Sequence, residues 1–467
     1  MQRKTTRIYG QIVRHDESPF WGLIVIDTET GLIVDVQKGA IFTADHCFGP
    51  YHLIFAGFGD VHIHAREDET GEQCYKETYE SACEAALHGG VVHVSAMPNT
   101  PRPLVSLAEF MWHRARVRAI DHPVLVVNYI GIQKGSRPIG KRGEHPYKCF
   151  FGKSVGPLSI LTIEELDETI RHFEGEYVSF HVELEEIVVA SAGGKTHSER
   201  RPAACVYEGL RLLLPLIEKY GIKAKLCHWP MDEGTFELIT EYRARGCEIE
   251  LEASPLHLLF STSDTDKDPS LWLKLQMNPA LRGVENPRRL IGGLKMGFVD
   301  YLATDHAPHT EEEKHLAFAK FRERYPGKSN VEIARLVEAE NPELFRATCC
   351  ENNTSGAPWL DTYALVCCWL MSEHGFRAQD IARIAAYNPG RFVNRFLPAQ
   401  YPGRDFGKGF GDIAPGYMGS LTVLNLARKT TVERKDLKTK VGWSPLEGQT
   451  FHGAVEAVFI AGKRYRA

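Results

Sequence analysis

The chain has 467 residues, of which 43% are hydrophobic and 25% charged, and these values are typical of a globular protein. Its 55 Lys and Arg residues nearly balance 60 Asp and Glu residues, so we do not expect nucleic acid or a membrane surface as a partner. No stretch approaches the roughly 20 apolar residues of a membrane-spanning helix, and the amino terminus lacks the apolar run of a signal peptide.

The cysteine pattern argues against a disulfide framework. The chain has 11 cysteines, an odd number, and they include the adjacent pairs Cys349–Cys350 and Cys367–Cys368. Adjacent pairs and scattered single cysteines are not typical of the conserved spacings found in disulfide-rich secreted domains. We therefore expect a cytoplasmic protein.

The two ends of the chain have the same character. Residues 1–56 and 401–467 contain runs of alternating β-forming residues, such as "TTRIYGQIV" and "GAVEAVFIAG", which turn at glycines. We expect these terminal segments to pair into one small domain, a β-sandwich formed by the N- and C-terminal segments.

Between these ends, residues 57–400 alternate between β-rich and helical segments. Eight short apolar runs read as strands, and the segments between them have apolar residues at helical spacing. The eight runs are 56–65, 91–97, 124–132, 146–151, 176–183, 222–229, 247–254 and 299–305. Eight such β/α units predict a closed (β/α)8 barrel, or TIM barrel, whose chemistry lies at the carboxyl ends of the strands.

Polar side chains that suit a metal site fall at these strand ends. His62 and His64 are two residues apart on the first strand, so both side chains point to the same face. Neutral imidazoles suit a transition metal, and the guanidinium of Arg66 suits an anion. The other candidates at strand ends or on the loops that follow them are Asn99, Lys148, His181, His228, Asn278, Asp305 and His309. Each alone has an ordinary explanation, but their coincidence at one end of a barrel favours a functional site.

Several motifs resemble those of the amidohydrolase superfamily and, within it, the class I dihydroorotases. They are "HIHAR", "AMPNT", "MNPALR" and "TDHAPHTEEEK", in the family's order, together with the strand-four lysine. The resemblance implies zinc-dependent, reversible hydrolysis of dihydroorotate to N-carbamoyl-aspartate, a step of pyrimidine biosynthesis. It also implies a metal ligand set, which consists of His62, His64, Lys148, His181, His228 and Asp305.

The resemblance further implies a role for each group at the site. Two Zn²⁺ ions would be bridged by carboxylated Lys148 and a hydroxide, because an unmodified ammonium beside two cations is opposed by both burial and like charge. Asp305 would act as general base and then general acid. Arg66, Asn99 and His309 would bind the substrate carboxylate, and Asn278 would contact the ring.

The chain departs from the family pattern in three places. Arg66 is followed by Glu-Asp-Glu-Thr rather than Glu-Pro-Gly, and His228 is followed by Trp-Pro. Residues 312–350 form an insertion of helical character, which we interpret as either an outer helical element or a lid over the substrate. Lys153 is a rival to Lys148 as the modified lysine, whereas His93, His257 and His306 are interpreted as structural residues.

Two other functions compete with a dihydroorotase. One is a different cyclic amidase, such as a hydantoinase, dihydropyrimidinase or allantoinase, whose ring carries no carboxylate for Arg66 and Asn99 to bind. The other is a non-catalytic dihydroorotase-like assembly partner, which the complete ligand set weighs against. The resemblance implies a homodimer or larger oligomer and association with aspartate carbamoyltransferase as a further option.

Overall fold

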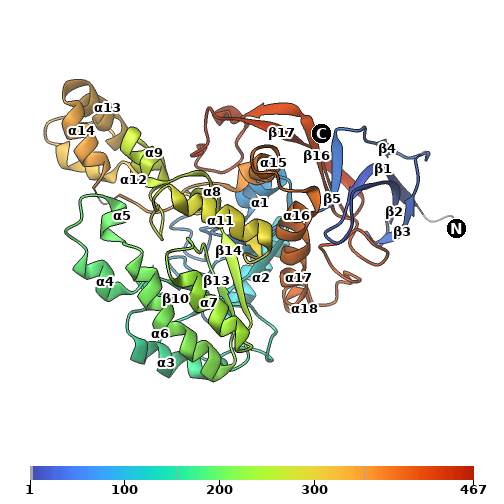
Figure 1. Cartoon of the computed structure of the whole chain (residues 1–467), viewed down its shortest axis with the longest axis horizontal. Coiled ribbons are helices and arrows are strands. Elements are labelled where there is room, and N and C mark those ends of the chain that lie inside the picture. Colours follow the sequence, from blue (N-terminus) through green and yellow to red (C-terminus); the bar gives the residue numbers. More distant parts are fainter. Residues whose placement is uncertain (1–3, 41, 155, 352, 467) are drawn as a thin grey trace.

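The computed structural model describes residues 4–40, 42–154, 156–351 and 353–466. Figure 1 shows a central group of parallel strands surrounded by helices, with a β-domain at one end and the helices α13 and α14 projecting at the other. Among the residues that the structure describes, no helix combines the length and the apolar character needed to cross a lipid bilayer.

Eight parallel strand positions form the predicted barrel. Their hydrogen-bonded order is β6, β7, β8 continued by β9, β10, β12, β13, β14 and β15. The ring closes where Ile63 pairs in parallel with His306 and the amide of His64 donates to the carbonyl of His306 at 2.7 Å. The bounds are Phe58–Ile63, Val91–Ala96, Leu125–Asn128, Ile130–Ile132, Tyr147–Phe151, Tyr177–Val182, Lys223–Leu226, Ile249–Ala253 and Tyr301–Leu302. The predicted barrel is confirmed.

Helices follow the barrel strands and bury their apolar faces against them. The sequence also sets where several begin, since Thr78 and Thr162 accept hydrogen bonds from backbone amides in the first turns of α1 and α3. The principal outer helices are α1 (Tyr79–His88), α2 (Leu107–Ile120), α3 (Ile163–Ile170), α6 (Ala204–Tyr220), α7 (Thr235–Ala244), α11 (Glu285–Met296), α15 (Tyr363–His374) and α17 (Asn388–Asn394). Shorter helices are α4 (Glu185–Ala190), α5 (His197–Arg200), α8 (Pro255–Leu259), α16 (Ala378–Ile381) and α18 (Leu397–Gln400).

Both ends of the chain contribute strands to one further sheet, as predicted. Its order is β18-β17-β16-β5-β1-β2-β3, and β4 also pairs with β1. The amino-terminal strands are β1 (Thr5–Val13), β2 (Phe20–Asp27), β3 (Ile33–Lys38), β4 (His46–Cys47) and β5 (His52–Ala56). The carboxy-terminal strands are β16 (Leu421–Thr431), β17 (Thr450–Ile460) and β18 (Lys463–Arg466). We call this sheet and its connections the β-domain.

The predicted insertion is helical and has a small core of its own. It contains α12 (Glu311–Lys314), α13 (Asn330–Glu340) and α14 (Pro342–Cys349), and it packs beside α9 (Thr262–Lys267) and α10 (Leu271–Leu275). Phe318, Ile333 and Phe345 cluster with Trp272 and Leu273, separately from the main core. These contacts place the insertion on the outside of the barrel, beside the loop that follows β14.

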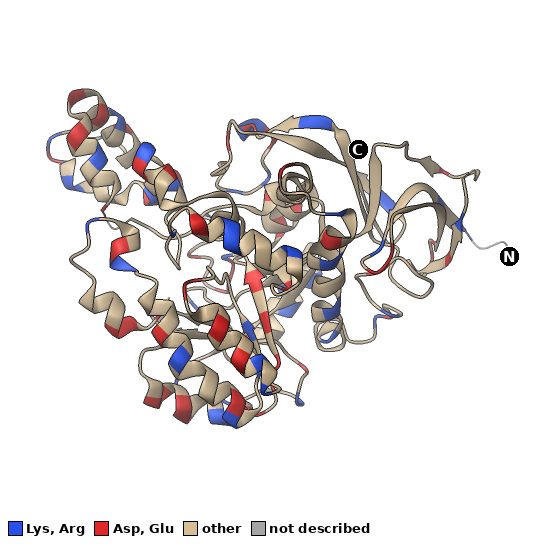
Figure 2. Cartoon of the chain, in the orientation of Figure 1, with Lys and Arg blue, Asp and Glu red and all other residues tan. Residues whose placement is uncertain are grey.

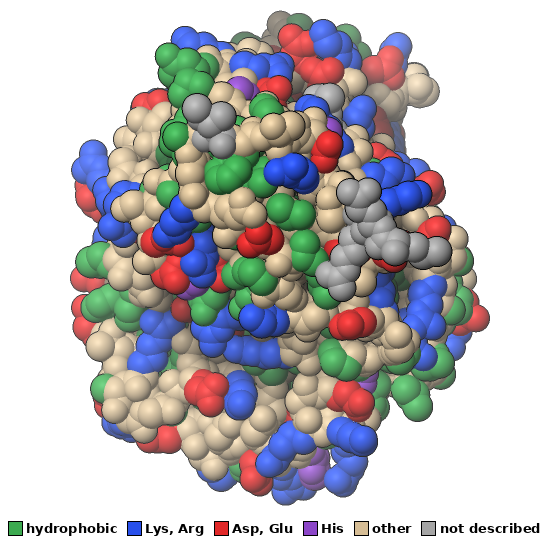
Figure 3. Space-filling view, turned by 90° about the vertical axis from the view of Figure 1, so that its right-hand side faces the viewer, with side chains coloured by type: hydrophobic (Ala, Val, Ile, Leu, Met, Phe, Trp, Pro, Cys, Tyr) green, Lys and Arg blue, Asp and Glu red, His purple; other side chains and the backbone are tan. Residues whose placement is uncertain are grey.

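Residues of both charge signs are interspersed on the outer helices. Figure 2 shows acidic and basic residues alternating along these helices, including α13 and α14. Figure 3 shows the end of the molecule that carries the β-domain, where Lys, Arg, Asp and Glu side chains alternate with hydrophobic ones. All 11 cysteines are free thiols.

His93 is an unusual buried group in the second barrel strand. Neither ring nitrogen has a hydrogen-bond partner, and the ring packs against Phe410 and close to Gly59. Burial lowers the pKa of His93 from 6.5 to about 3, so the ring is neutral in the folded protein. This side chain serves packing, as the sequence predicted.

Replacing His93 with Leu should remove part of the protein's acid sensitivity. Below pH 6.5 the unfolded chain binds a proton at this ring, whereas the folded chain binds it only near pH 3. The free energy of unfolding of the wild type, relative to that of His93→Leu, should therefore decrease by about 1.4 kcal/mol for each pH unit that the pH falls below 6.5. Denaturant unfolding at pH values from 8 to 5, roughly the range in which the unfolded chain gains this proton, measures the difference in stability. His452→Leu on the exposed face of β17 is the control, and a pH-independent difference for His93→Leu would contradict the prediction.

Candidate functional site

A cavity of about 410 Å³ opens at the carboxyl ends of the barrel strands and brings the predicted site residues together. Its lining includes His62, His64, Arg66, Asn99, Lys148, His181, His228, Asn278, Asp305 and His309. Additional lining residues that the sequence did not single out are Gln73, Ser154, Arg201, Asn353 and Ser355. Residues from the first strand to the loop after the eighth therefore meet in one space.

His62, His64 and Asp305 form the tightest cluster in this cavity. The Nε2 atoms of both histidines lie 3.1 Å from Oδ1 of Asp305. One ligand atom from each of these three residues falls within 4.8 Å of the others, the spacing of a possible metal site. A second such group combines His62 with Cys227 and Glu252.

The outer nitrogens of both histidines are fixed by acceptors. Nδ1 of His62 lies 2.9 Å from Oε2 of Glu252, and Nδ1 of His64 lies 2.7 Å from Oδ1 of Asn99. An acceptor at Nδ1 selects the tautomer that leaves a lone pair on Nε2, as in most metal-binding histidines. Both Nε2 lone pairs then point toward the cavity, beside Asp305.

The electrostatics of this cluster favour a cation. Burial opposes the protonation of His62, but Glu252 and Asp305 outweigh burial and raise the pKa of His62 well above 6.5. Burial lowers the pKa of His64 to about 3, so that ring is neutral. The space between the two carboxylates is therefore one in which positive charge is stabilised, whether it is carried by a proton or by a metal ion.

His181 and His228 form a second donor pair. Nδ1 of His181 and Nε2 of His228 lie 3.1 Å apart, and Nε2 of His181 lies 3.1 Å from Oε2 of Glu183. Because the Glu183 carboxylate accepts a hydrogen bond from Nε2–H of His181, the Nδ1 lone pair of His181 faces His228. Burial lowers the pKa of both rings, so two neutral nitrogens face each other. This arrangement, like that at His62 and His64, fits a bound transition metal.

Lys148 lies at the base of the cavity and is 0% exposed. Its Nζ lies 2.9 Å from Sγ of Cys227 and 4.8 Å from the centre of the Phe150 ring. The rival Lys153 is exposed on the loop that follows β10, where it lines the rim. Of the two lysines, only Lys148 projects from a strand into the interior of the site.

The opposite wall is formed by Arg66 and His309. Burial lowers the pKa of Arg66 to about 10, which keeps it charged at neutral pH, and it lies 3.3 Å from Nε2 of His309. Burial lowers the pKa of His309 to about 3. Its Nδ1 is 3.2 Å from Glu313, and Glu313 in turn pairs with Lys76 at 2.8 Å. A charged guanidinium beside a neutral imidazole is a suitable binding wall for a carboxylate.

Three site residues have left-handed backbone conformations, which are uncommon outside glycine. The φ angles are 59° at Arg66, 35° at His228 and 50° at Asp305. Each residue ends or follows a barrel strand, so the chain turns sharply where its side chain must enter the cavity. Such conformations cost of order 1–3 kcal/mol and persist only where the surroundings fix them.

The first loop departs from the family pattern and is held by its own carboxylates. Oδ1 of Asp68 accepts hydrogen bonds from the Thr70 amide at 2.9 Å and the Thr70 hydroxyl at 2.6 Å. Its Oδ2 accepts from the Arg102 amide at 2.7 Å, and Glu67 accepts from the Tyr79 amide at 2.8 Å. Glu67 and Asp68 therefore give the loop a defined path directly after Arg66.

Asn278 lies on the loop after β14, where Oδ1 is 3.0 Å from Nε2 of His197 and 3.3 Å from the Ser355 hydroxyl. His257 lies outside the cavity, between Ser254 and the Pro279 carbonyl, and His306 lies beside Glu77. Their hydrogen bonds agree with the structural roles expected for both.

Sequence reasoning missed the buried charged residues behind the histidines. Glu252 pairs with Lys225, and both side chains are 0% exposed. Glu183 pairs with Arg201 at 2.7 Å. Burial raises the pKa of each carboxylate, but Lys225 and Arg201 outweigh it and hold both near 2. A charged residue inside an apolar strand was the available signal, since Lys225, Glu252 and Glu183 all lie in or directly after predicted strands.

Comparison with curated proteins identifies relatives over most of the chain. The chain is 30% identical over 315 residues to a dihydroorotase from Brevibacillus brevis, covering 61% of this chain and 70% of that protein. It is 26% identical over 411 residues to a dihydroorotase from Pyrococcus furiosus, covering 88% of this chain and 81% of that protein. A dihydroorotase from Macrococcus caseolyticus matches at 24% identity, with 97% of this chain and 96% of that protein covered.

Solved structures share the fold at lower sequence identity. An L-hydantoinase from Arthrobacter aurescens superposes with a TM-score of 0.76 at 19% identity, covering 99% of this chain and 96% of that one. A D-hydantoinase from Thermus sp. gives a TM-score of 0.75, also at 19% identity, covering 99% and 95% of the two chains. No protein-family model matches the chain. From its curated relatives, this chain is a hydrolase that belongs to the dihydroorotase family, among the cyclic amidases of the amidohydrolase superfamily.

Proposed function

We propose that this chain is a zinc-dependent dihydroorotase, which reversibly hydrolyses the cyclic amide of dihydroorotate to N-carbamoyl-aspartate. The observation that carries the proposal is the pairing of Arg66 with His309 on the wall that faces the histidine and Asp305 cluster. A cation on that wall suits a ring that bears a carboxylate, whereas the uncharged rings of hydantoin or dihydrouracil have no group for it. The curated relatives named dihydroorotase support the same substrate.

The proposed ligand set would hold two zinc ions. His62, His64 and Asp305 would bind one, and His181 and His228 the other. The neutral amine of Lys148 would add CO₂ and lose one proton, and the resulting carbamate would hold both ions. The metal would polarise the ring carbonyl and lower the pKa of the attacking water. The selected histidine tautomers and the buried position of Lys148 support this assignment.

The chain's own groups would orient the substrate and move the proton. Arg66 and His309, together with the side-chain amide of Asn99, would bind the carboxylate, because Oδ1 of Asn99 is already engaged by His64 and its NH₂ group is left to donate. Asn278 would contact the ring, oriented by His197. Asp305 would accept the proton of the attacking water and deliver it to the ring nitrogen as the amide bond breaks.

We further propose a cellular location and assembly state for the protein. The substrate is a small molecule, and the protein acts in the cytoplasm as a homodimer or larger oligomer, alone or with aspartate carbamoyltransferase, as the resemblance implies. Direct measurement of turnover distinguishes a dihydroorotase from the two competing functions, a different cyclic amidase and a non-catalytic assembly partner.

Turnover of dihydroorotate should exceed that of hydantoin, dihydrouracil and allantoin, and it should depend on Arg66. Removing one partner of a buried charged contact costs about 3–5 kcal/mol, so Arg66→Ala should lower kcat/KM for dihydroorotate by about 10²–10⁴-fold. Steady-state assays with zinc quantified in the same samples provide the test, with Arg102→Ala at an exposed ion pair as control. Turnover of an uncharged ring instead would overturn the substrate assignment, and absence of all turnover would favour the assembly partner.

Zinc affinity should depend on the carboxylate behind His62. Glu252→Gln, combined with Lys225→Met so that no buried ammonium is left unpaired, keeps the shape of the side chain but weakens the acceptor that orients His62, so zinc affinity should fall about 10–100-fold. Competition with a chromogenic chelator measures this affinity without reference to activity. Glu250→Gln, on the same strand but hydrogen-bonded to Tyr301, is the matched control. Equal zinc affinity in both variants would exclude Glu252 from the support of the metal site.

A further inference from the structure

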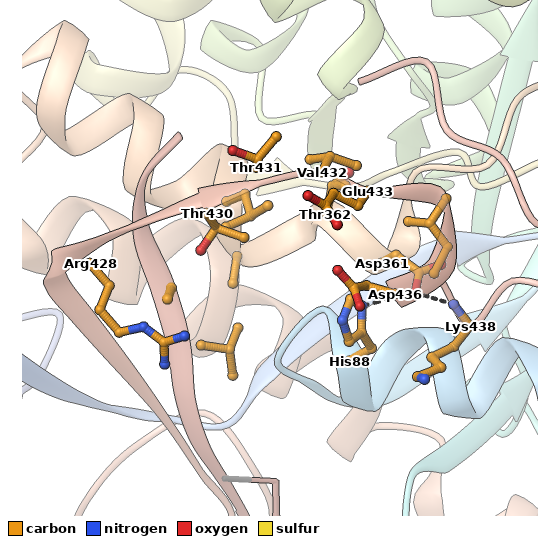
Figure 4. A pocket seen from close by; sticks show the side chains of 15 residues that line it. His88, Asp361, Thr362, Arg428, Thr430, Thr431, Val432, Glu433, Asp436 and Lys438 are labelled. Atoms are coloured by element: carbon orange, nitrogen blue, oxygen red, sulfur yellow. Dashed lines mark hydrogen bonds and ion pairs between the residues drawn. The ribbon is translucent and has the colours of Figure 1, made fainter. Parts of the chain in front are cut away.

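The connection between β16 and β17, residues 432–449, leaves the β-domain and lies against the mouth of the barrel. Figure 4 shows one of its anchor points, where the backbone of Lys438 meets the carboxylate of Asp361. The amides of Lys438 and Thr439 donate to Asp361 at 2.8 and 3.0 Å. Asp361 lies just before α15, so this contact joins the β-domain connection to the barrel.

A second anchor point joins the same connection to the segment that follows the eighth barrel strand. Glu77 is fully buried, and it accepts hydrogen bonds from the Thr439 hydroxyl at 2.5 Å and the Lys440 amide at 3.2 Å. Its Oε2 also lies 3.1 Å from Nε2 of His306, the residue next to Asp305. Arg434 adds a two-pronged ion pair to Glu311 at the start of α12, at 2.8 and 2.9 Å.

Trp443 makes the contact that reaches the site itself. Its indole Nε1–H donates to the backbone carbonyl of His309 at 2.8 Å, and the side chain is 2% exposed. His309 is the residue whose ring lies beside Arg66 on the carboxylate-binding wall. The ring is held by Glu313 from one side, and the backbone is held by Trp443 from the other.

Apart from these polar contacts, Val432, Trp443 and Leu446 anchor the connection in the main hydrophobic core. A cavity of about 410 Å³ lies beneath residues 432–438, bounded on the barrel side by His88, Asp361 and Leu365 (Figure 4). Trp443 does not line this cavity, and because it is packed in the main core, its N–H donor is held in a fixed position against the His309 carbonyl. Small displacements of a positioning contact are known to affect substrate binding strongly.

We propose that Trp443 is a positioning residue for His309, through which the β-domain sets the geometry of the wall that binds the substrate carboxylate. This inference rests on the proposed dihydroorotase function. Trp443 does not touch the cavity; it acts by fixing the peptide that carries His309, with Arg434 supporting the same segment through Glu311. Its loss should therefore weaken substrate binding and leave the chemical step unchanged.

The experiment compares Trp443→Phe, which keeps a buried ring but removes the N–H donor, with Trp112→Phe on the outer helix α2. Loss of one buried hydrogen bond should raise KM for dihydroorotate about fivefold in Trp443→Phe, with kcat and bound zinc unchanged. In a His309→Ala background the same substitution should have no further effect on KM, because the residue that it positions is gone. The control variant should keep the wild-type KM.

Arg434→Gln is the second variant, because it removes an exposed ion pair and does not threaten folding. It should raise KM about twofold at low salt, and the effect should vanish at high salt. The inference is overturned if KM is unchanged in Trp443→Phe. It is also overturned if Trp443→Phe raises KM equally in the wild-type and the His309→Ala backgrounds. If Trp443→Phe does not fold, an unchanged KM in Arg434→Gln overturns it. Wild-type turnover is measured first, since its absence overturns the proposed function instead.

Discussion

The ion pair between Lys225 and Glu252 inside the barrel is the interaction on which the arrangement of the site depends. Neither side chain is exposed, and Lys225 is surrounded by the rings of Tyr129, Tyr301 and Phe392. A lone charge in such surroundings would be strongly unfavourable, so each ion is stable only with the other present. Glu252 also holds Nδ1 of His62 and lies 3.3 Å from the amide of His228. One paired carboxylate therefore orients groups on two of the strands that carry the proposed metal ligands.

The same arrangement occurs on the other side of the cavity. Arg201 pairs with Glu183, and Glu183 orients His181. Each of the two histidine pairs is thus supported by a buried carboxylate that a buried or half-buried cation keeps ionised. The supporting charges belong to the interior of the fold, whereas the outer helices carry residues of both charge signs (Figure 2). The site is set by this inner layer of paired charges as much as by the residues that face the substrate.

The sequence predicted the parts of the site that local pattern determines. The barrel strands and the His62-x-His64 spacing follow from alternation and period, which act over a few residues. The partner of Lys225 could not be predicted in this way. Lys223 and Lys225 have the same residue type in the same strand, yet Lys223 is exposed and Lys225 is buried. Only the tertiary fold brings Glu252, on the next strand, to one of them and leaves the other in water.

The contacts of the insertion and of the β-domain connection also join residues far apart in sequence, which local pattern does not predict. Helical character over 312–350 was predictable, but the separate core that Phe318 and Ile333 make with Trp272 was not, because it joins segments more than 40 residues apart. The hydrogen bond from Trp443 to His309 spans 134 residues. No periodicity relates the two positions, and a tryptophan in a terminal segment has an ordinary interpretation as a core residue.

The β-domain is joined to the first barrel strand as well as to the last. Only Gly57 separates β5 from β6, so the strand that carries His62 continues directly from the β-domain sheet. A side chain at Gly57 would collide with Val92, and its amide donates to the Ser420 carbonyl at 2.7 Å. Thr422 on β16 accepts from the Phe58 amide and donates to the Gly90 carbonyl, which ties the same junction to the second strand. Because β16 also leads into the connection that contains Trp443, one terminal hairpin contacts both the strand that carries His62 and the segment that carries His309. The pairing of the two chain ends therefore forms part of the framework that holds the site.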